Sequence, residues 1–182
     1  MAITYEGLKA LRSDAVPYAW TERDSMLYAV AIGMGRDPLD RKELRFTWEG
    51  LPLRTVPTQA VTVARQNLTW NAGLNVGKFL HGGQTLTLHR PLPVEAKIVA
   101  DHWIAEVYDR GPEKGLILEI ETRAKLLDGT PLFDVAQTIF ARGDGGLAGS
   151  GGGASGRPRG PHPIPDRAPD FVRRAETRPD QA

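Results

Sequence analysis

The alternation of hydrophobic and polar positions is clearest in the second half of the chain, where it predicts three long strands. Successive side chains of a strand point to opposite faces of its sheet, so a period of two indicates a strand with one buried face. The predicted strands span Ala96–Asp109, Leu116–Leu127 and Pro131–Arg142. The first places Val99, Trp103 and Val107 on one face, and the third places Phe133, Val135 and Ile139 inside. In the second, one face is apolar and the other charged, with Leu116, Leu118, Ile120, Ala124 and Leu126 on the apolar face.

Two turns connect these strands. Asp128-Gly129 is a strong hairpin signal between the second and third strands. The segment Arg110–Gly115 contains two glycines, a proline and two cations, and it predicts the turn between the first and second strands. Short connections of this kind join antiparallel neighbours, so an antiparallel sheet is expected.

The segment Phe79–Pro93 predicts a further strand at which the sheet begins. Leu86 and Leu88 alternate with Thr85, Thr87 and His89, which indicates a half-buried strand. The segment opens with His81-Gly82-Gly83, whose glycines allow another group to approach the backbone closely. Arg90, Pro91 and Pro93 are expected to end the strand.

The first part of the chain predicts helix and loop. Thr21 and Asp24 fit a capping box that starts a helix at Glu22–Ile32, with Leu27 and Val30 packed on the core. Further along, Leu44–Glu49 is predicted to be a short strand, Ala60–Val63 a helix or a strand, and Asn67–Lys78 an ordered loop. A helix followed by long antiparallel strands predicts an α+β fold.

The composition changes abruptly at Gly143, where a glycine-rich segment follows the last predicted strand. Such a segment behaves as a flexible linker, and we expect it to be mobile. A proline-rich, charged tail with few core residues follows it. The predicted organisation is an N-terminal extension (1–17), one folded domain (18–142), a linker (143–160) and an extended tail (161–182).

The overall composition limits the classes of function to consider. The chain has 182 residues, 41% hydrophobic and 25% charged, which suits one globular domain. A net charge of +1 gives no reason to expect binding to nucleic acid or to a membrane surface. The sequence has no cysteine, and its four histidines do not have the spacing of metal ligands. No metal site is therefore predicted. No apolar stretch predicts a membrane span or a signal peptide, so a cytoplasmic location is expected.

Several motifs occur in an order that resembles a known family. They are Tyr18–Asp24, Asp37-Pro38, Phe46–Gly50, Pro57-Thr58, Phe79–Pro93, Lys125–Phe133 and Ile164–Asp170. Together they resemble the N-terminal half of R-specific enoyl-CoA hydratases, the MaoC-like or hydratase 2 proteins. The resemblance is to the form with two hotdog domains found in type 2 multifunctional enzymes of β-oxidation and their bacterial relatives, and it covers Tyr18–Ala182.

This resemblance implies a hotdog fold, an antiparallel sheet wrapped around a helix. In the family, the second hotdog carries the catalytic Asp and His in a Gly-Asp-x-Asn-Pro-x-His motif, and the first holds the acyl chain and part of CoA. Here Gly143-Asp144 is followed by two further glycines, so that motif is missing. The chain stops in what looks like the lead-in to a catalytic hotdog. We therefore expect no catalytic residue, and either a homodimer or a partner hotdog subunit that supplies the Asp and His.

Three residues are candidates for binding the acyl-CoA substrate. His81 and Gly82 match the family residues at the CoA ester, where backbone N–H groups and an imidazole can donate to a carbonyl. Arg110 falls where the family places a cation for the CoA phosphates, with Lys114 nearby as a second choice. The simpler interpretations are a histidine that is bonded to the backbone and a solvated turn cation. The thioester is a substrate, so no cofactor is expected.

Two other function classes remain open: a binding or assembly subunit without turnover, and a hotdog thioesterase. A thioesterase needs a carboxylate at the start of its central helix, and Thr58–Gln66 contains none. A catalytic triad that uses Ser25 and His81 has no support from spacing. Asp134 and Glu119 are expected on a solvated strand face.

Overall fold

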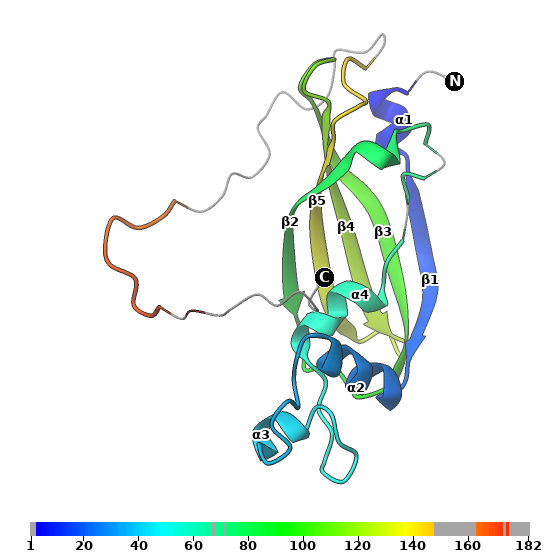
Figure 1. Ribbon diagram of the computed structural model, residues 1–182. Helices are drawn as coiled ribbons and strands as arrows, with labels where there is room; N and C mark the ends of the chain where they lie inside the picture. The colour runs from blue at the N-terminus through cyan, green and yellow to red at the C-terminus, as the bar shows by residue number, and fades with distance from the viewer. Residues whose placement is uncertain (1–2, 67, 71, 148–162, 173, 175–182) are drawn as a thin grey trace.

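The computed structural model describes residues 3–66, 68–70, 72–147, 163–172 and 174. A curved antiparallel sheet forms one layer, and short helices lie against one of its faces (Figure 1). We call this the inner face. The elements are α1 (Tyr5–Lys9), β1 (Arg12–Trp20), α2 (Glu22–Ala31), α3 (Arg41–Leu44), the 3₁₀ turn η1 (Pro57–Gln59), α4 (Ala60–Val63), the 3₁₀ turn η2 (Val76–Lys78), β2 (Phe79–Leu88), β3 (Ala96–Asp109), β4 (Leu116–Leu126) and β5 (Pro131–Ala141).

The five strands are ordered β1-β3-β4-β5-β2, and every neighbouring pair is antiparallel. This confirms the predicted α+β hotdog fold, and the bounds of β3, β4 and β5 agree with the predicted strands within one residue. The order places β1 and β2 at the two edges of the sheet.

The predicted turns are also confirmed. Between β3 and β4, the Arg110 N–H donates to the Gly115 carbonyl at 2.9 Å, and Gly111 and Gly115 both have positive φ. Between β4 and β5, the Thr130 N–H donates to the Asp128 carboxylate at 2.9 Å, and Gly129 has φ 86°.

The sheet begins earlier than the sequence predicted. Residues 12–17, assigned above to an N-terminal extension, form most of β1 and pair with β3. Helix α1 also belongs to the fold, because Leu8 is buried in the core and the Tyr5 hydroxyl donates to Glu106 at 2.8 Å. The strand in the segment Phe79–Pro93 is β2 (Phe79–Leu88), which is an edge strand and not the start of the sheet.

Helix α2 confirms the capping box but not the predicted buried face. Thr21 accepts a hydrogen bond from the Asp24 N–H, and the Asp24 carboxylate accepts one from the Thr21 N–H. However, Leu27 is 62% exposed and Val30 55%, and the buried residues are Ser25 and Ala29. The Ser25 hydroxyl donates to the Val94 carbonyl at 2.7 Å, so the helix packs through small side chains that allow close approach to the backbone.

The predicted strand at Leu44–Glu49 is wrong. Residues 41–44 form α3, because Asp40 caps the Lys42 and Glu43 N–H groups, and turns follow it. The second ambiguous segment, Ala60–Val63, is helical. The described residues of the predicted loop Asn67–Lys78 form turns and η2.

A bulge in β3 separates residues that were predicted to share one face. The register with β4 shifts between Ile104 and Glu106, so Val107 lies on the same face as the buried residues that precede the bulge. Those residues are Ile98, Ala100, His102 and Ile104. Val99 and Trp103, which were predicted to share a face with Val107, lie on the opposite, outer face.

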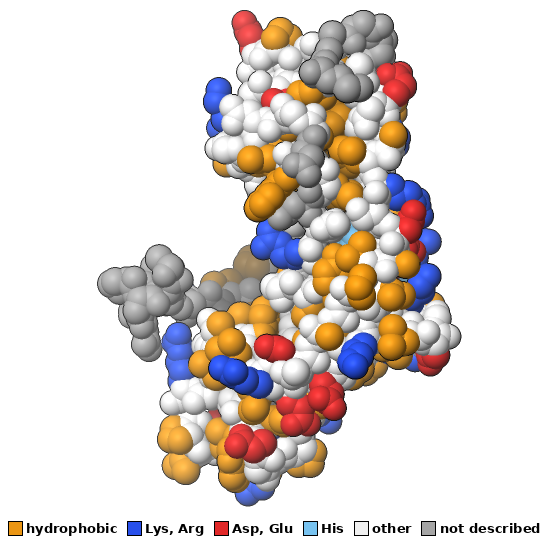
Figure 2. Space-filling model, turned by 90° about the vertical axis from the view of Figure 1, so that its right-hand side faces the viewer, with side chains coloured by type: hydrophobic (Ala, Val, Ile, Leu, Met, Phe, Trp, Pro, Cys, Tyr) orange, Lys and Arg blue, Asp and Glu red, His pale blue; other side chains and the backbone are white. Residues whose placement is uncertain are grey.

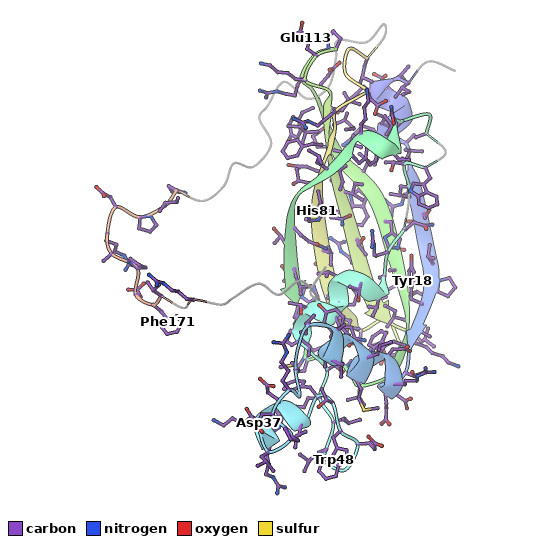
Figure 3. The ribbon with its side chains drawn as sticks, in the orientation of Figure 1. Tyr18, Asp37, Trp48, His81, Glu113 and Phe171 are labelled. Atoms are coloured by element: carbon purple, nitrogen blue, oxygen red, sulfur yellow. The ribbon has the colours of Figure 1, made fainter. Side chains whose placement is uncertain are left out.

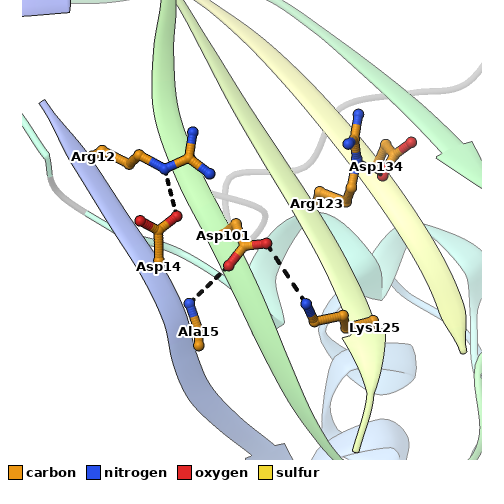
Figure 4. A network of polar contacts seen from close by, with 7 residues as sticks. All are labelled: Arg12, Asp14, Ala15, Asp101, Arg123, Lys125 and Asp134. Atoms are coloured by element: carbon orange, nitrogen blue, oxygen red, sulfur yellow. Dashed lines mark hydrogen bonds and ion pairs between the residues drawn. The ribbon is translucent and has the colours of Figure 1, made fainter. Parts of the chain in front are cut away.

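The outer face carries a polar network (Figure 4). Asp101 accepts a hydrogen bond from the Ala15 N–H at 2.7 Å and lies 3.9 Å from the Lys125 ammonium. Ala15 has φ 50°, the one non-glycine positive φ among the described residues, and it sits where the register of β1 shifts. Asp101 thus stabilises the irregular conformation of the edge strand.

The core consists of two clusters on the inner face. Helix α4 covers the first, near one end of the sheet, and α1 with Leu68, Ala72 and Leu74 covers the second, near the other end. The first cluster includes Trp20, Ala60, Ile98, Leu132 and Phe133, and the second includes Leu8, Leu74, Ile104, Val107 and Leu118. Between the two ends the surface on the helix-bearing side is hollowed (Figure 2).

The first residues of the predicted linker pack on the domain. Asp109 accepts hydrogen bonds from the N–H groups of Gly146 and Leu147 at 2.9 and 2.7 Å, and Leu147 packs on the second cluster. Residues 146 and 147 of the predicted linker are thus in contact with the domain, and the mobility of the linker stays a prediction. Residues 148–160 lie outside the described residues. In the tail, residues 163–172 are exposed.

Candidate functional site

The strand register places His81 on the inner face of the sheet. Residues paired directly across antiparallel strands point to the same face. His81 pairs with Ile139, Ile139 with Leu118, and Leu118 with Val107, and the last two are buried in the second cluster. His81 is exposed because it lies on edge strand β2 (Figure 3).

The neighbouring row has the same gradient from a polar edge to an apolar floor. Gln84 pairs with Gln137, Gln137 with Ile120, and Ile120 with Ile104. Gln84 is exposed, Gln137 and Ile120 are half-buried, and Ile104 is buried. We call the inner-face surface formed by His81, Gln84, Gln137, Ile120 and Ile139 the trough.

The trough is open because the central helix is short. The four residues of α4 extend about 6 Å, whereas the 14 residues of β3 extend about 46 Å. Helix α4 contacts β5 and β1, so it crosses the sheet over the first core cluster only. Toward β2, the middle of the inner face is half-buried or exposed at Ile120, Gln137 and Gln84.

A buried polar group lies in the row beside the trough, and the sequence reasoning missed it. The His102 Nδ1 is 2.8 Å from the Thr122 hydroxyl, and its Nε2 is 2.9 Å from the Tyr18 hydroxyl. Burial lowers the pKa of His102, although Asp101 opposes this shift, and burial raises the pKa of Tyr18. A neutral imidazole with both nitrogens engaged orders this part of the sheet and is not a free base. The available signal was a histidine in register with Ile98, Ala100 and Ile104.

The neighbour of Gly82 is an aromatic ring of the same chain. A Cβ atom at Gly82 would overlap the ring of Phe140, which comes from β5. The register of β2 with β5 shifts between His81 and Gly83, so Gly82 is the extra residue of a bulge. The close approach that this glycine permits is thus to Phe140.

The structure does not bring Arg110 next to His81. Arg110 is exposed at the start of the β3–β4 turn, three strand spacings or about 14 Å from β2. The same turn does reach β2 through Glu113, which with Lys78, Leu80 and Arg142 lines a pocket of about 450 Å³. Lys114 is exposed in the same turn. This end of the molecule therefore presents several cations beyond the trough, and Glu113 marks it in Figure 3.

The residues required for the other functions are not assembled. Ser25 is buried and donates to the Val94 carbonyl, so it forms no triad with His81. The central helix begins with Gln59, a buried amide whose Oε1 has no hydrogen-bond partner among the described residues. Asp134 bonds His89 at 3.0 Å, and it is separated in register from Glu119.

Two further properties concern metals and membranes. Among the described residues, no three His, Asp or Glu side chains come together as metal ligands. No helix in the described part of the chain has the length and apolar character needed to cross a membrane.

A family model and several known proteins match this chain. The family described as the MFE-2 hydratase 2 N-terminal domain matches residues 18–143. The chain is 33% identical to 3-hydroxyacyl-thioester dehydratase Y of Mycobacterium tuberculosis over 100% of its own length and 61% of that protein. It is 30% identical to the peroxisomal multifunctional enzyme type 2 of Mus musculus over 90% of its length and 22% of that protein. The chain thus spans less than two thirds of either relative.

Solved structures show the same fold. A MaoC-like dehydratase from Phytophthora capsici aligns with a TM-score of 0.69 at 24% identity, over 90% of this chain and 56% of that one. The ChsH1-ChsH2 complex from Mycobacterium tuberculosis aligns with a TM-score of 0.54 at 14% identity, over 76% of this chain and 94% of that one.

Proposed function

This chain belongs to the MFE-2 hydratase 2 N-terminal domain family, and we propose that it is the acyl-CoA-binding half of an R-specific 2-enoyl-CoA hydratase. The catalytic Asp and His come from a partner hotdog. The observation that carries the proposal is the trough, in which half-buried Ile120 and Ile139 lie beside exposed His81, away from the core cluster that the short central helix covers. Its relatives include proteins named hydratase and hydroxyacyl-thioester dehydratase.

The trough suits the acyl chain. Ile120 and Ile139 offer an apolar floor that continues into the second core cluster. His81, at the rim, carries a nitrogen that can donate to the thioester carbonyl. Binding in the trough removes the acyl chain from water and fixes the position of the thioester carbonyl. Such positioning lowers the barrier to water addition.

The cations beyond the trough suit the phosphates of CoA. Lys78 and Arg142 line the pocket near the start of β2 together with Glu113, and Arg110 is exposed in the turn that carries Glu113. Guanidinium groups bind phosphate oxygens through paired N–H donors. An extended thioester can therefore reach these cations while its carbonyl lies at His81.

Proton transfer has to come from another chain or domain. Hydration of the double bond needs a positioned base and acid near the β-carbon, each worth about 10² to 10⁴ in rate. Asp144 is the one aspartate that follows a glycine, and its carboxylate instead accepts the Asn75 N–H at 3.0 and 3.1 Å. It holds the 143–147 segment and does not act as a base.

The proposed partner is a catalytic hotdog subunit or a second copy of this chain. Edge strand β2 and its neighbour expose Leu80 (48%) and Phe140 (38%), and exposed strand edges favour pairing. The ChsH1-ChsH2 complex, which has the same fold, contains two different chains. No nucleic acid or membrane enters this proposal, and we propose a cytoplasmic location.

The test is a hydration assay with crotonyl-CoA and decenoyl-CoA, following loss of the conjugated-thioester absorbance. We expect no turnover by this chain alone and turnover when a catalytic hotdog subunit is added. Robust turnover by the isolated chain would contradict the proposal.

A binding or assembly subunit without turnover is the second candidate, favoured by the lack of a carboxylate among the residues that form the trough. It predicts thioester binding but no gain of activity with any catalytic hotdog subunit. Release of free thiol from either substrate would instead favour the thioesterase, which the amide at Gln59 disfavours.

A further inference from the structure

The segment between α2 and η1 projects from the end of the molecule opposite the β3–β4 turn. Figure 3 shows Asp37 and Trp48 on this projection and Glu113 at the other end. The acidic residues of the projecting segment accept hydrogen bonds from backbone N–H groups. Asp37 accepts from Leu39, Asp40 from Lys42 and Glu43, and Glu43 from Gly35. These carboxylates hold the loop in shape.

Three arginines of this projection line one pocket. Arg41 and Arg45 are four residues apart across α3 and its C-cap, so their side chains lie on the same helical face. The Arg54 N–H donates to the Arg45 carbonyl at 2.8 Å and brings the third arginine alongside. The pocket has a volume of about 300 Å³, and Leu51 and Pro52 complete its lining.

These cations have no anionic partner within the described part of the chain. None of the three lies within 4.0 Å of a carboxylate there, and the buried Arg45 Nε has no hydrogen-bond partner there. Guanidinium groups stay protonated, and like charges four residues apart on a helix repel each other. An oxyanion in this pocket would relieve the repulsion and accept the unused N–H donors.

We propose that Arg41, Arg45 and Arg54 form a binding site for the phosphoryl group of a small phosphate compound. Phosphate carries more charge and more acceptor oxygens than a carboxylate, and it matches the fork of each guanidinium. Leu51 and Pro52 provide an apolar wall for the organic part of a phosphate ester. The site is at the opposite end from the cations assigned to CoA, so it does not depend on the proposed hydratase function.

The test uses ¹H–¹⁵N correlation spectra of the arginine Nε–Hε groups in the full chain. The probes are adenosine 5′-monophosphate, inorganic phosphate and adenosine, titrated at constant low ionic strength because salt screens exposed charges. We expect the Arg45 Nε–Hε resonance to shift with both phosphate probes and not with adenosine. Tighter binding of the nucleotide assigns the site to organic phosphates, and equal binding assigns it to free phosphate.

Variants distinguish this site from general attraction to a positive surface. Arg45→Gln and Arg41→Gln should each weaken phosphate binding roughly tenfold, because each removes a charge-assisted hydrogen bond. Lys42→Gln removes a cation of the same helix outside the pocket, so it should retain binding. Because Arg41 is exposed, its variant stays informative if Arg45→Gln fails to fold. The proposal is overturned if no resonance shifts, or if Lys42→Gln weakens binding as much as the pocket variants.

Discussion

At the scale of single residues, two neighbouring glycines of β2 have different surroundings. A Cβ atom at Gly82 would overlap the Phe140 ring, whereas a Cβ atom at Gly83 would meet only the Thr138 hydroxyl at 4.0 Å. We predict that Gly82→Ala destabilises the chain by about 1–3 kcal/mol, the usual cost of overpacking. Gly83→Ala is the matched control and should change stability by less than about 0.5 kcal/mol.

Urea unfolding measures both variants. The Phe140→Leu background adds a further check, because removal of the ring should reduce the cost of Gly82→Ala. Equal effects of the two alanine substitutions would show that the ring moves aside easily.

The buried His102 predicts a pH dependence of stability. Burial, opposed by Asp101, lowers the pKa of His102 in the folded state, so the folded chain binds a proton less readily than the unfolded chain. The contribution to stability is complete above the unfolded pKa of about 6.5. It is lost as the pH falls through the lower pKa of the folded state.

This prediction is checked by unfolding between neutral and mildly acidic pH. The His102→Gln variant keeps an amide that can bond Tyr18 and Thr122 but does not titrate. The free energy of unfolding should fall more steeply with decreasing pH in the parent chain than in this variant. Parallel profiles would mean that His102 titrates alike in both states.

At the scale of elements, one carboxylate joins the β3–β4 turn to the segment after β5. Asp109 accepts the N–H groups of Gly111, Gly146 and Leu147. Partial burial alone would raise the pKa of Asp109, but these hydrogen bonds lower it overall. The carboxylate is therefore held ionised where both segments meet.

We predict that Asp109→Asn releases residues 145–147 and costs about 1–3 kcal/mol, because an amide cannot replace the charged acceptor. Hydrogen exchange should accelerate at Gly146 and Leu147. Asp128→Asn, in the β4–β5 turn, is the control and should leave exchange at those residues unchanged. Slow exchange in the Asp109 variant would show that Leu147 packing is sufficient.

At the scale of the whole molecule, the exposed edge strand predicts association. We expect a homodimer, or co-purification with a catalytic hotdog subunit, because β2 presents an unpaired edge within the described chain. Light scattering after size exclusion measures the state. A monodisperse monomer would contradict the expectation.

The assignment of Arg110 to the CoA phosphates can be tested separately in the assembled protein. Arg110→Ala should weaken CoA binding more than binding of a pantetheine thioester, which lacks the nucleotide phosphates. Arg123→Ala, an exposed cation on the outer face, should affect neither ligand. Calorimetry on both ligands gives the comparison, and equal loss for both ligands in the Arg110 variant would show that Arg110 is not a phosphate ligand.

The local features of this fold could be predicted from sequence because each depends on neighbouring residues. The period-two alternation located β3, β4 and β5, and Asp128-Gly129 specified the hairpin between them. Thr21 and Asp24 specified the start of α2 through hydrogen bonds between residues that are three positions apart. The ordered motifs also identified the family and the missing catalytic motif.

Only the tertiary structure decided which faces these elements bury and which residues meet. The bulge after Ile104 moves the residues that follow it to the other face of β3, and the pairing of β1 with β3 joins residues 76 to 91 positions apart. Likewise, the sheet register turns His81 toward the trough and keeps Arg110 away from it, and the Arg54–Arg45 backbone bond completes the arginine pocket. Strand register and long-range backbone contacts result from the packing of the whole chain. They therefore cannot be predicted from the local periodicity of the sequence.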